Sequence, residues 1–186
     1  MTTLSEKIAG ERRRLKSVRQ LLTTAVARKS GGNPSFVPFY LALGDYMETA
    51  MDRLHAQDVK MGDMIRRKLV TLDDNARLAL DELHERLTGN QAYLTVFSAA
   101  KDALQSEGAD ALERFEQASA AYTAYIMANM GHHGRTTELA AKLFSDADWA
   151  YMAGVTEAET ALEQELYARA FALLPAALAD LQPVAV

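Results

Sequence analysis

The sequence contains no cysteine among its 186 residues. Disulfides, thiolate nucleophiles, cysteine-ligated zinc and iron–sulfur clusters are therefore excluded. Proline is nearly as scarce, with four residues in the chain, and none lies between Pro38 and Pro175. Because proline interrupts helices, this span can form long ones without a break.

Long apolar runs are absent as well. No run approaches the roughly 20 residues that a helix needs to cross a bilayer, and the polar, periodic start of the chain does not look like a secretory signal. Glycine-rich phosphate loops and the G-x-S-x-G and H-E-x-x-H motifs are missing. We expect a soluble, cytoplasmic protein with no membrane span, and an enzyme is the less favoured class because no nucleophile or acid–base pair stands out.

Apolar residues recur at three- and four-residue intervals through most of the chain, which predicts an all-α protein. Residues 30–34, Ser-Gly-Gly-Asn-Pro, form a clear break after a first helix over residues 3–28. We therefore predict an antiparallel four-helix bundle over residues 34–175. A separate basic amphipathic helix over residues 1–30 precedes it, and a tail over residues 176–186 follows.

Local signals refine the expected helices. Thr71 is a candidate N-cap for the third helix, and Gly89-Asn90 marks a point where that helix ends or kinks. A fourth helix starts near Asp110 and carries His133 on its apolar stripe. Ser145 is the expected N-cap of one last helix, on which Trp149 is largely buried and acts as an anchor.

Charge is distributed unevenly. Residues 1–29 carry eight basic and two acidic side chains, whereas the net charge of the whole chain is −5. The favoured interpretation is that the basic helix packs on the acidic body of its own chain or mediates a homo-oligomer. Contact with a nucleic acid or an anionic lipid is the weaker alternative, since the protein as a whole is acidic.

Histidines and carboxylates suggest a metal site. His55, His84 and His133 lie on three different predicted helices, facing the interior or nearly so. Asp58 follows His55 by three positions, and Glu138 follows His133 by five. Imidazole and carboxylate ligands in a bundle interior suit iron or manganese. The competing interpretation is that each histidine is an ordinary core or boundary residue with a hydrogen-bond partner.

A resemblance to a known family rests on three segments: residues 39–58 (F-Y…G-D-Y…M-D-R-L-H-A-Q-D), residues 131–135 (G-H-H-G-R) and residues 144–150 (F-S-D-A-D-W-A). Over about residues 36–170 the chain resembles the hemerythrin-like (HHE cation-binding) superfamily. The resemblance implies a four-helix bundle whose interior binds a di-iron centre for dioxygen or related small molecules, or for sensing. It also implies ligand roles for His55 and for the pair His133 and Glu138.

The ligand set is smaller than that of a full di-iron site. The positions four residues after His55, His84 and His132 hold Val59, Thr88 and Thr136, none of which is a ligand of the family's kind. Two hypotheses remain open. In the first, the bundle binds non-haem iron through the reduced set and serves small-molecule binding or sensing. In the second, it is a metal-free structural, regulatory or protein-interaction module.

Overall fold

The structure is a computed structural model that describes residues 4–129 and 134–182. Within these ranges the chain is all-α and has no strand, which confirms the predicted class. The elements are α1 (Leu4–Arg28), α2 (Phe36–Lys68), α3 (Asp74–Glu107), the 3₁₀ helix η1 (Gly108–Ala111), α4 (Leu112–Asn129), α5 (Gly134–Leu143), α6 (Asp146–Met152), α7 (Glu157–Ala172) and the 3₁₀ helix η2 (Ala176–Leu181).

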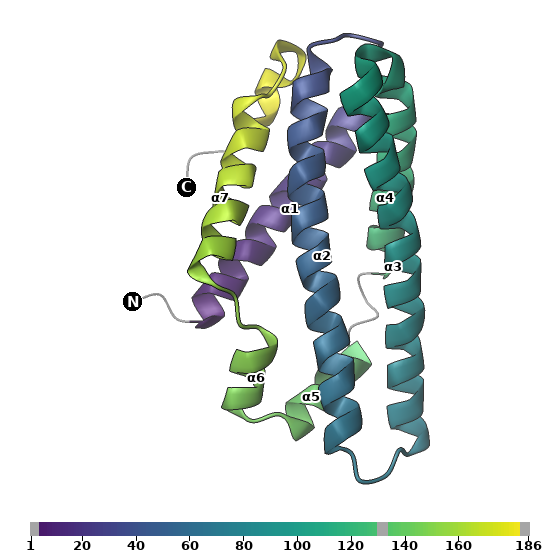
Figure 1. Cartoon of the computed structure of the whole chain (residues 1–186), viewed down its shortest axis with the longest axis vertical. Helices are drawn as coiled ribbons and strands as arrows, with labels where there is room; N and C mark the ends of the chain where they lie inside the picture. The colour runs from purple at the N-terminus through teal and green to yellow at the C-terminus, as the bar shows by residue number, and fades with distance from the viewer. Residues whose placement is uncertain (1–3, 130–133, 183–186) are drawn as a thin grey trace.

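Two long antiparallel helices, α2 and α3, form the backbone of the fold (Figure 1). They have 33 and 34 residues, whereas α4 and α7 have 18 and 16. The short helices α4 and α7 therefore accompany only the upper half of the long pair, as Figure 1 is drawn, and α1 crosses diagonally behind α2. At the lower end, α5 and α6 take the place of α4 and α7.

The turn between α1 and α2 lies at the break that the sequence predicted. Gly31 and Gly32 adopt positive φ angles of 59° and 79°, a backbone conformation that suits glycine. Asn33 Oδ1 then accepts a hydrogen bond from the Ser35 amide at 3.0 Å. The third helix, in contrast, is capped by Asp73, whose side chain accepts from the Ala76 amide, so the expectation of a Thr71 cap is wrong.

The end of the chain forms two helices where one was expected. Ser145 is the N-cap of α6, as predicted, and forms a capping box with Asp148. The helix ends at Met152, and a second capping box between Thr156 and Glu159 starts α7. Such a box satisfies free backbone amides at a helix start, so it defines a new helix after the break near Gly154.

Gly89 and Asn90 neither end nor kink the third helix, because α3 runs through both. A Cβ atom on Gly89 would lie 2.2 Å from the hydroxyl of Tyr125 on α4, so glycine here allows close approach of that ring. Asn90 accepts a hydrogen bond from the Tyr122 hydroxyl at 2.9 Å. The two residues therefore join α3 to α4. The predicted fourth helix is seen as far as Asn129, beyond which residues 130–133 lie outside the described residues.

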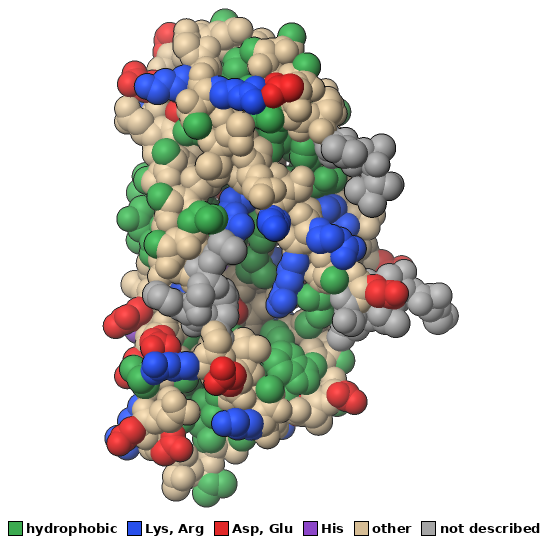
Figure 2. Space-filling model, turned by 180° about the vertical axis from the view of Figure 1, so that it is seen from behind, with side chains coloured by type: hydrophobic (Ala, Val, Ile, Leu, Met, Phe, Trp, Pro, Cys, Tyr) green, Lys and Arg blue, Asp and Glu red, His purple; other side chains and the backbone are tan. Residues whose placement is uncertain are grey.

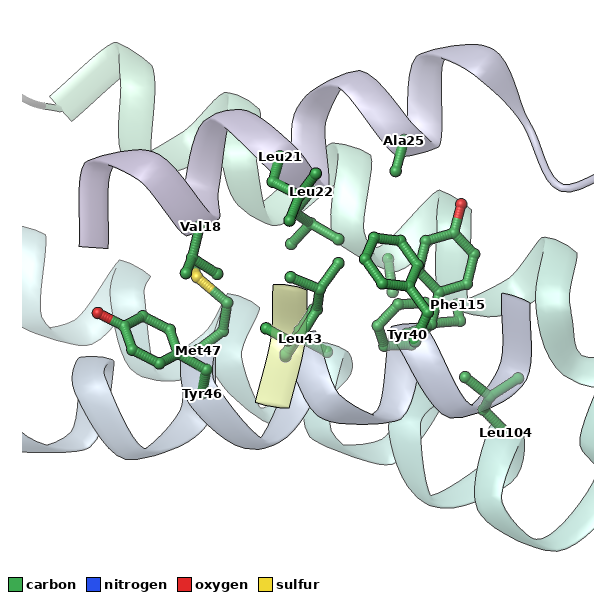
Figure 3. Close-up of a cluster of buried hydrophobic side chains, with 14 of the residues drawn as sticks. Val18, Leu21, Leu22, Ala25, Tyr40, Leu43, Tyr46, Met47, Leu104 and Phe115 are labelled. Carbon is green, nitrogen blue, oxygen red and sulfur yellow. The ribbon is translucent and has the colours of Figure 1, made fainter. Parts of the chain in front are cut away.

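The main core fills the upper half of the molecule, where aliphatic and aromatic side chains of α1, α2, α3 and α4 meet (Figure 3). Its labelled members are Val18, Leu21, Leu22, Ala25, Tyr40, Leu43, Tyr46, Met47, Leu104 and Phe115. The apolar stripe of α1 is thus buried against its own chain, since Val18 and Leu22 are fully inaccessible to solvent.

A second, smaller core lies at the lower end. It consists of Met61, Met64, Ile65, Leu80, Ala140 and Phe144, from α2, α3, α5 and the turn after α5. Between the two cores, α2 has no buried residue over positions 51–60. The buried face of α2 is therefore interrupted in its middle, beside a space that side chains do not fill.

A buried carboxylate connects α7 to α1 and α2. Glu163 on α7 is 1% exposed, and its Oε2 lies 2.6 Å from the Arg14 guanidinium. Its Oε1 accepts a hydrogen bond from the Tyr46 hydroxyl at 2.7 Å. Burial and this bond raise the pKa of Tyr46, so the phenol remains the donor. The basic first helix is therefore held partly by an acidic residue of its own chain, as the charge distribution predicted.

We predict that Glu163→Ala lowers the free energy of unfolding by about 2–3 kcal/mol, because it leaves a half-buried guanidinium and a buried hydroxyl without their partner. Urea denaturation followed by circular dichroism measures the change. The control is Glu165→Ala, which removes an exposed carboxylate from the same helix and should change the value by less than about 0.5 kcal/mol. Equal effects of the two substitutions would contradict the role given to Glu163.

Candidate functional site

A cavity of about 590 Å³ lies between the two cores. Its walls come from the first half of α1, the middle of α2 and α3, the end of α4, and α5 and α6. Aliphatic and sulfur-containing side chains dominate this lining: Ile8, Leu15, Met47, Met51, Leu54, Met61, Leu87, Ile126 and Met152. The rest of the lining includes four arginines, two carboxylates, one histidine, amides and aromatic residues.

The unequal helix lengths explain why the cavity exists. Over the described residues, α4 reaches Asn129 and α7 begins at Glu157, and neither covers the middle of α2 and α3 fully. α5 and α6 close the lower end, yet they pack against the second core and leave the space above it open. Six of the ten positions of α2 without a buried residue, 51–60, border this space.

The first helix provides one wall through a single face. Ile8, Glu11, Arg12, Leu15 and Arg19 all line the cavity, and they are spaced by three, four and seven positions. That spacing places side chains on the same side of an α-helix. α1 therefore uses two faces: an apolar stripe packs in the main core, and a face with both apolar and charged side chains lines the cavity.

Two ion pairs cross the cavity lining. Glu11 on α1 lies 3.0 Å from the guanidinium of Arg53 on α2, and both side chains are largely buried. Burial raises the pKa of Glu11, with Arg53 opposing the shift. Asp58 on α2 lies 2.6 Å from the guanidinium of Arg86 on α3. Each carboxylate at the cavity is therefore engaged by an arginine of the neighbouring helix.

Arg19 differs from these arginines. It is partly buried and lines the cavity, but its side chain takes part in none of the ion pairs or hydrogen bonds found in the described part of the chain. Burial lowers its pKa, although a guanidinium stays protonated in proteins. Arg12, two turns before it, is exposed and also lines the cavity.

The cavity is therefore a positive region of an acidic protein. Four arginines face two carboxylates in its lining, whereas the chain as a whole carries −5. Seen from behind, the molecule has Lys and Arg side chains gathered beside a hollow whose interior is hydrophobic (Figure 2). Because Glu11 and Asp58 pair with Arg53 and Arg86, the excess positive charge lies on Arg12 and Arg19, and such an excess attracts ligands of the opposite sign.

His55 is the one histidine in the lining. It is partly buried, and its Nδ1 atom is buried with no hydrogen-bond partner in the described residues. A buried polar atom without a partner is costly and marks a position where a ligand group or water is accommodated. His55 is therefore the predicted site residue whose surroundings agree best with a functional role.

The other predicted metal ligands are less well placed. Asp58 lines the cavity but is paired with Arg86. His84 and Glu138 are exposed, so the expectation that His84 faces inward is wrong: the buried face of α3 passes through Leu83 instead. His133 lies outside the described residues. Among the residues that the structure describes, no group of three or more potential metal ligands converges.

The floor of the cavity includes the short helix α6. Trp149 and Met152 line it, and the Trp149 ring lies edge-on to Phe144 with centroids 5.3 Å apart. Trp149 is partly buried and packs against the second core. It belongs to α6, so the expectation that it lies on the last helix is wrong. The end of α6 at Met152 separates this tryptophan from α7.

An ion pair holds α6 in place. Lys68, at the end of α2, lies 2.8 Å from the carboxylate of Asp148, which also accepts hydrogen bonds from the Ser145 amide and hydroxyl. Lys68 and then Ser145 lower the pKa of Asp148 from 3.8 to about 2. The charged form of Asp148 is thus the form that caps the helix carrying Trp149.

Sequence reasoning missed the arginines of this site. Arg19, Arg53 and Arg86 were not singled out, because isolated arginines on helices are common. The available signal was the spacing on the first helix, where Arg12 and Arg19 flank Leu15 on one face. No such signal existed for Arg86, because its role depends on the packing of α3 against Asp58 of α2.

Comparisons with family models, with curated proteins and with solved structures give no match for the chain. Across the described residues, no helix has both the length and the apolar character that a membrane crossing requires.

We predict that acid loosens α6. The pKa of Asp148 is lower in the folded protein, at about 2, than its ordinary value of 3.8. The stability that its charged form contributes is therefore complete above about pH 4 and is lost as the pH falls toward about 2. Trp149 emission should shift to longer wavelengths in this window. Asp148→Asn should show the shifted emission already at neutral pH and little change below it.

The control for this titration is Asp146→Asn, which removes an exposed carboxylate from the same first turn of α6. It should keep the acid transition of the unmodified protein. A transition that is the same in Asp148→Asn as in the unmodified protein would show that other carboxylates cause it.

Proposed function

We propose that this protein is a non-enzymatic binding protein that takes a small, mostly apolar molecule into the cavity between its two cores. The observation that carries the proposal is the cavity itself, with a volume of about 590 Å³. Small-molecule sites in proteins have volumes of roughly 300–1,000 Å³, with apolar walls and a few placed polar groups. The lining described above has this composition.

Binding is favoured over catalysis by the state of the charged groups. Glu11 and Asp58, the two carboxylates of the lining, each pair with an arginine. Each carboxylate would have to leave its arginine before it could contact a ligand. The walls are therefore suited to orienting a ligand, and a role as a carrier or a sensor is the one we propose.

We also propose that the fold is a four-helix bundle of the hemerythrin-like kind, as the sequence resemblance implies. The support is the antiparallel packing of neighbouring helices: α2 packs on α3 and α3 on α4, while α1 packs on both α2 and α4 and α7 lies against α2 (Figure 1). Ligand sites in such bundles lie between facing helices. The position of the cavity agrees with this arrangement.

Trp149 provides a direct measurement of ligand binding, because it is the only tryptophan of the chain and lines the cavity. We predict that a neutral apolar probe, decanol, changes its emission with a saturable dependence on concentration. Ala50→Leu should weaken this binding about tenfold, equivalent to ~1.4 kcal/mol. The reason is that Ala50 is 4% exposed and lines the cavity, so a larger side chain occupies the space that the ligand needs.

The matched control is Ala56→Leu, the same substitution at an exposed position of the same helix. It should leave decanol binding unchanged. Absence of saturable binding to the unmodified protein, or equal binding by both variants when both are folded by circular dichroism, would rule the proposed function out.

A metal centre is the second candidate, and the unpaired Nδ1 of His55 favours it. His55 and Asp58 are three positions apart on α2, and both line the cavity. Of the rest of the predicted set, His84 and Glu138 are exposed and His133 lies outside the described residues, so this candidate depends on His55 and Asp58. An imidazole and a carboxylate on one helix face suit non-haem iron or manganese, although Asp58 would have to exchange its Arg86 partner for the metal.

For the metal candidate we predict near-stoichiometric iron or manganese in untagged protein produced in iron-supplemented medium. His55→Ala should lose the metal, as measured by elemental analysis, because it removes the ligand at the cavity. His84→Ala serves as the comparison: its exposed position on α3 implies that the metal is retained. A metal content well below one ion per chain, equal in the unmodified protein and in His55→Ala, would favour the hypothesis that the protein is metal-free.

A further inference from the structure

We propose that the ligand of the cavity is an amphiphile with a carboxylate head group, such as a medium-chain fatty acid, and that Arg19 binds this head group with the assistance of Arg12. This inference deepens the proposed function and depends on it. It assigns a charge and a polarity to the ligand, where the cavity volume alone indicates only that a small molecule fits.

The first argument is charge balance within the cavity. Arg53 and Arg86 each have a carboxylate partner at 3.0 Å and 2.6 Å. Arg19 has no such partner among the described residues, although it is partly buried. A guanidinium removed from water without an anion is costly. An anionic group of the ligand would supply the missing partner.

The second argument is the placement of the two free arginines. Arg12 and Arg19 are seven residues apart on α1, which is about 10 Å along the helix axis, and Leu15 lies between them on the same face. Arg12 is exposed and Arg19 is partly buried. An anion bound to Arg19 would therefore lie within the cavity wall. Arg12 adds a positive charge nearer to solvent, which attracts the anion.

The third argument is the chemistry of the remaining lining. Met47, Met51, Leu54 and Met61 of α2 and Ile126 of α4 form an apolar surface. Methionine side chains are flexible and polarisable, and they adapt to ligands of irregular shape. An alkyl chain fits such a surface, whereas a guanidinium binds a carboxylate through two parallel hydrogen bonds. One carboxylate on an alkyl chain satisfies both parts of the cavity.

The experiment compares three probes of equal chain length: decanoate, decanol and decylamine. They differ in head-group charge, so the apolar contribution is held constant. Binding is followed by Trp149 emission and by isothermal titration calorimetry on the full chain, below the concentrations at which the probes form micelles. We expect decanoate to bind at least about tenfold more tightly than decanol, and decylamine to bind most weakly.

Variants of Arg19 then test the head-group site. Arg19→Met keeps most of the side-chain volume and removes the charge, so it should weaken decanoate binding about tenfold and leave decanol binding unchanged. Arg19→Lys should restore part of the decanoate affinity, because it restores the charge without the bidentate geometry. Arg67→Met, at an exposed position of α2 outside the cavity lining, should behave like the unmodified protein.

The outcomes separate the two proposals. Saturable decanol binding without a preference for decanoate, or an equal loss of both probes in Arg19→Met, overturns the head-group assignment and leaves the proposed function standing. Tighter binding of decylamine overturns the assignment as well. If none of the three probes binds to the unmodified protein, the proposed function fails, and the head-group assignment fails with it. Circular dichroism of each variant excludes loss of the fold as the cause.

Discussion

The difference in helix length is the constraint on which the rest of this structure depends. α2 and α3 are about twice as long as α4 and α7, so four helices can pack together along only half of the long pair. The lower half is closed by the two short helices α5 and α6, which pack on the long pair around the second core. A cavity between the two packing regions is the geometric result, and its position follows from where α4 ends and α7 begins.

Buried charge determines how the first helix lies on this frame. α1 contributes Val18 and Leu22 to the main core, but apolar contacts alone are not directional. The pairing of Arg14 with Glu163 and of Glu11 with Arg53 fixes the rotation of α1 about its axis. The same rotation places Arg19 at the cavity. The stability of the fold and the polarity of the cavity wall therefore have a common origin in the charges of one helix.

Local sequence patterns predicted much of the fold and little of the site. The three- and four-residue periodicity, the Gly31-Gly32 break and the Ser145 cap correspond to observed features, because each depends on neighbours in sequence. The space for a side chain at Gly89 is taken by the Tyr125 ring of another helix, which the sequence of α3 does not report. The division of the last helix was visible locally, in the capping box at Thr156, and was overlooked. The cavity arginines depended on contacts between distant helices, which spacing along one helix does not report.

The separation of the two cores has a consequence for how the molecule moves. Among the described residues, the lower core has six buried side chains, far fewer than the upper one. Regions with few buried apolar contacts open locally at a lower free energy. The α5–α6 end is therefore the less stable cooperative unit, and it can open while the upper helices stay assembled. Since this unit forms the floor of the cavity, exchange of a bound molecule with solvent need not involve global unfolding, and its rate would be governed by the small core alone.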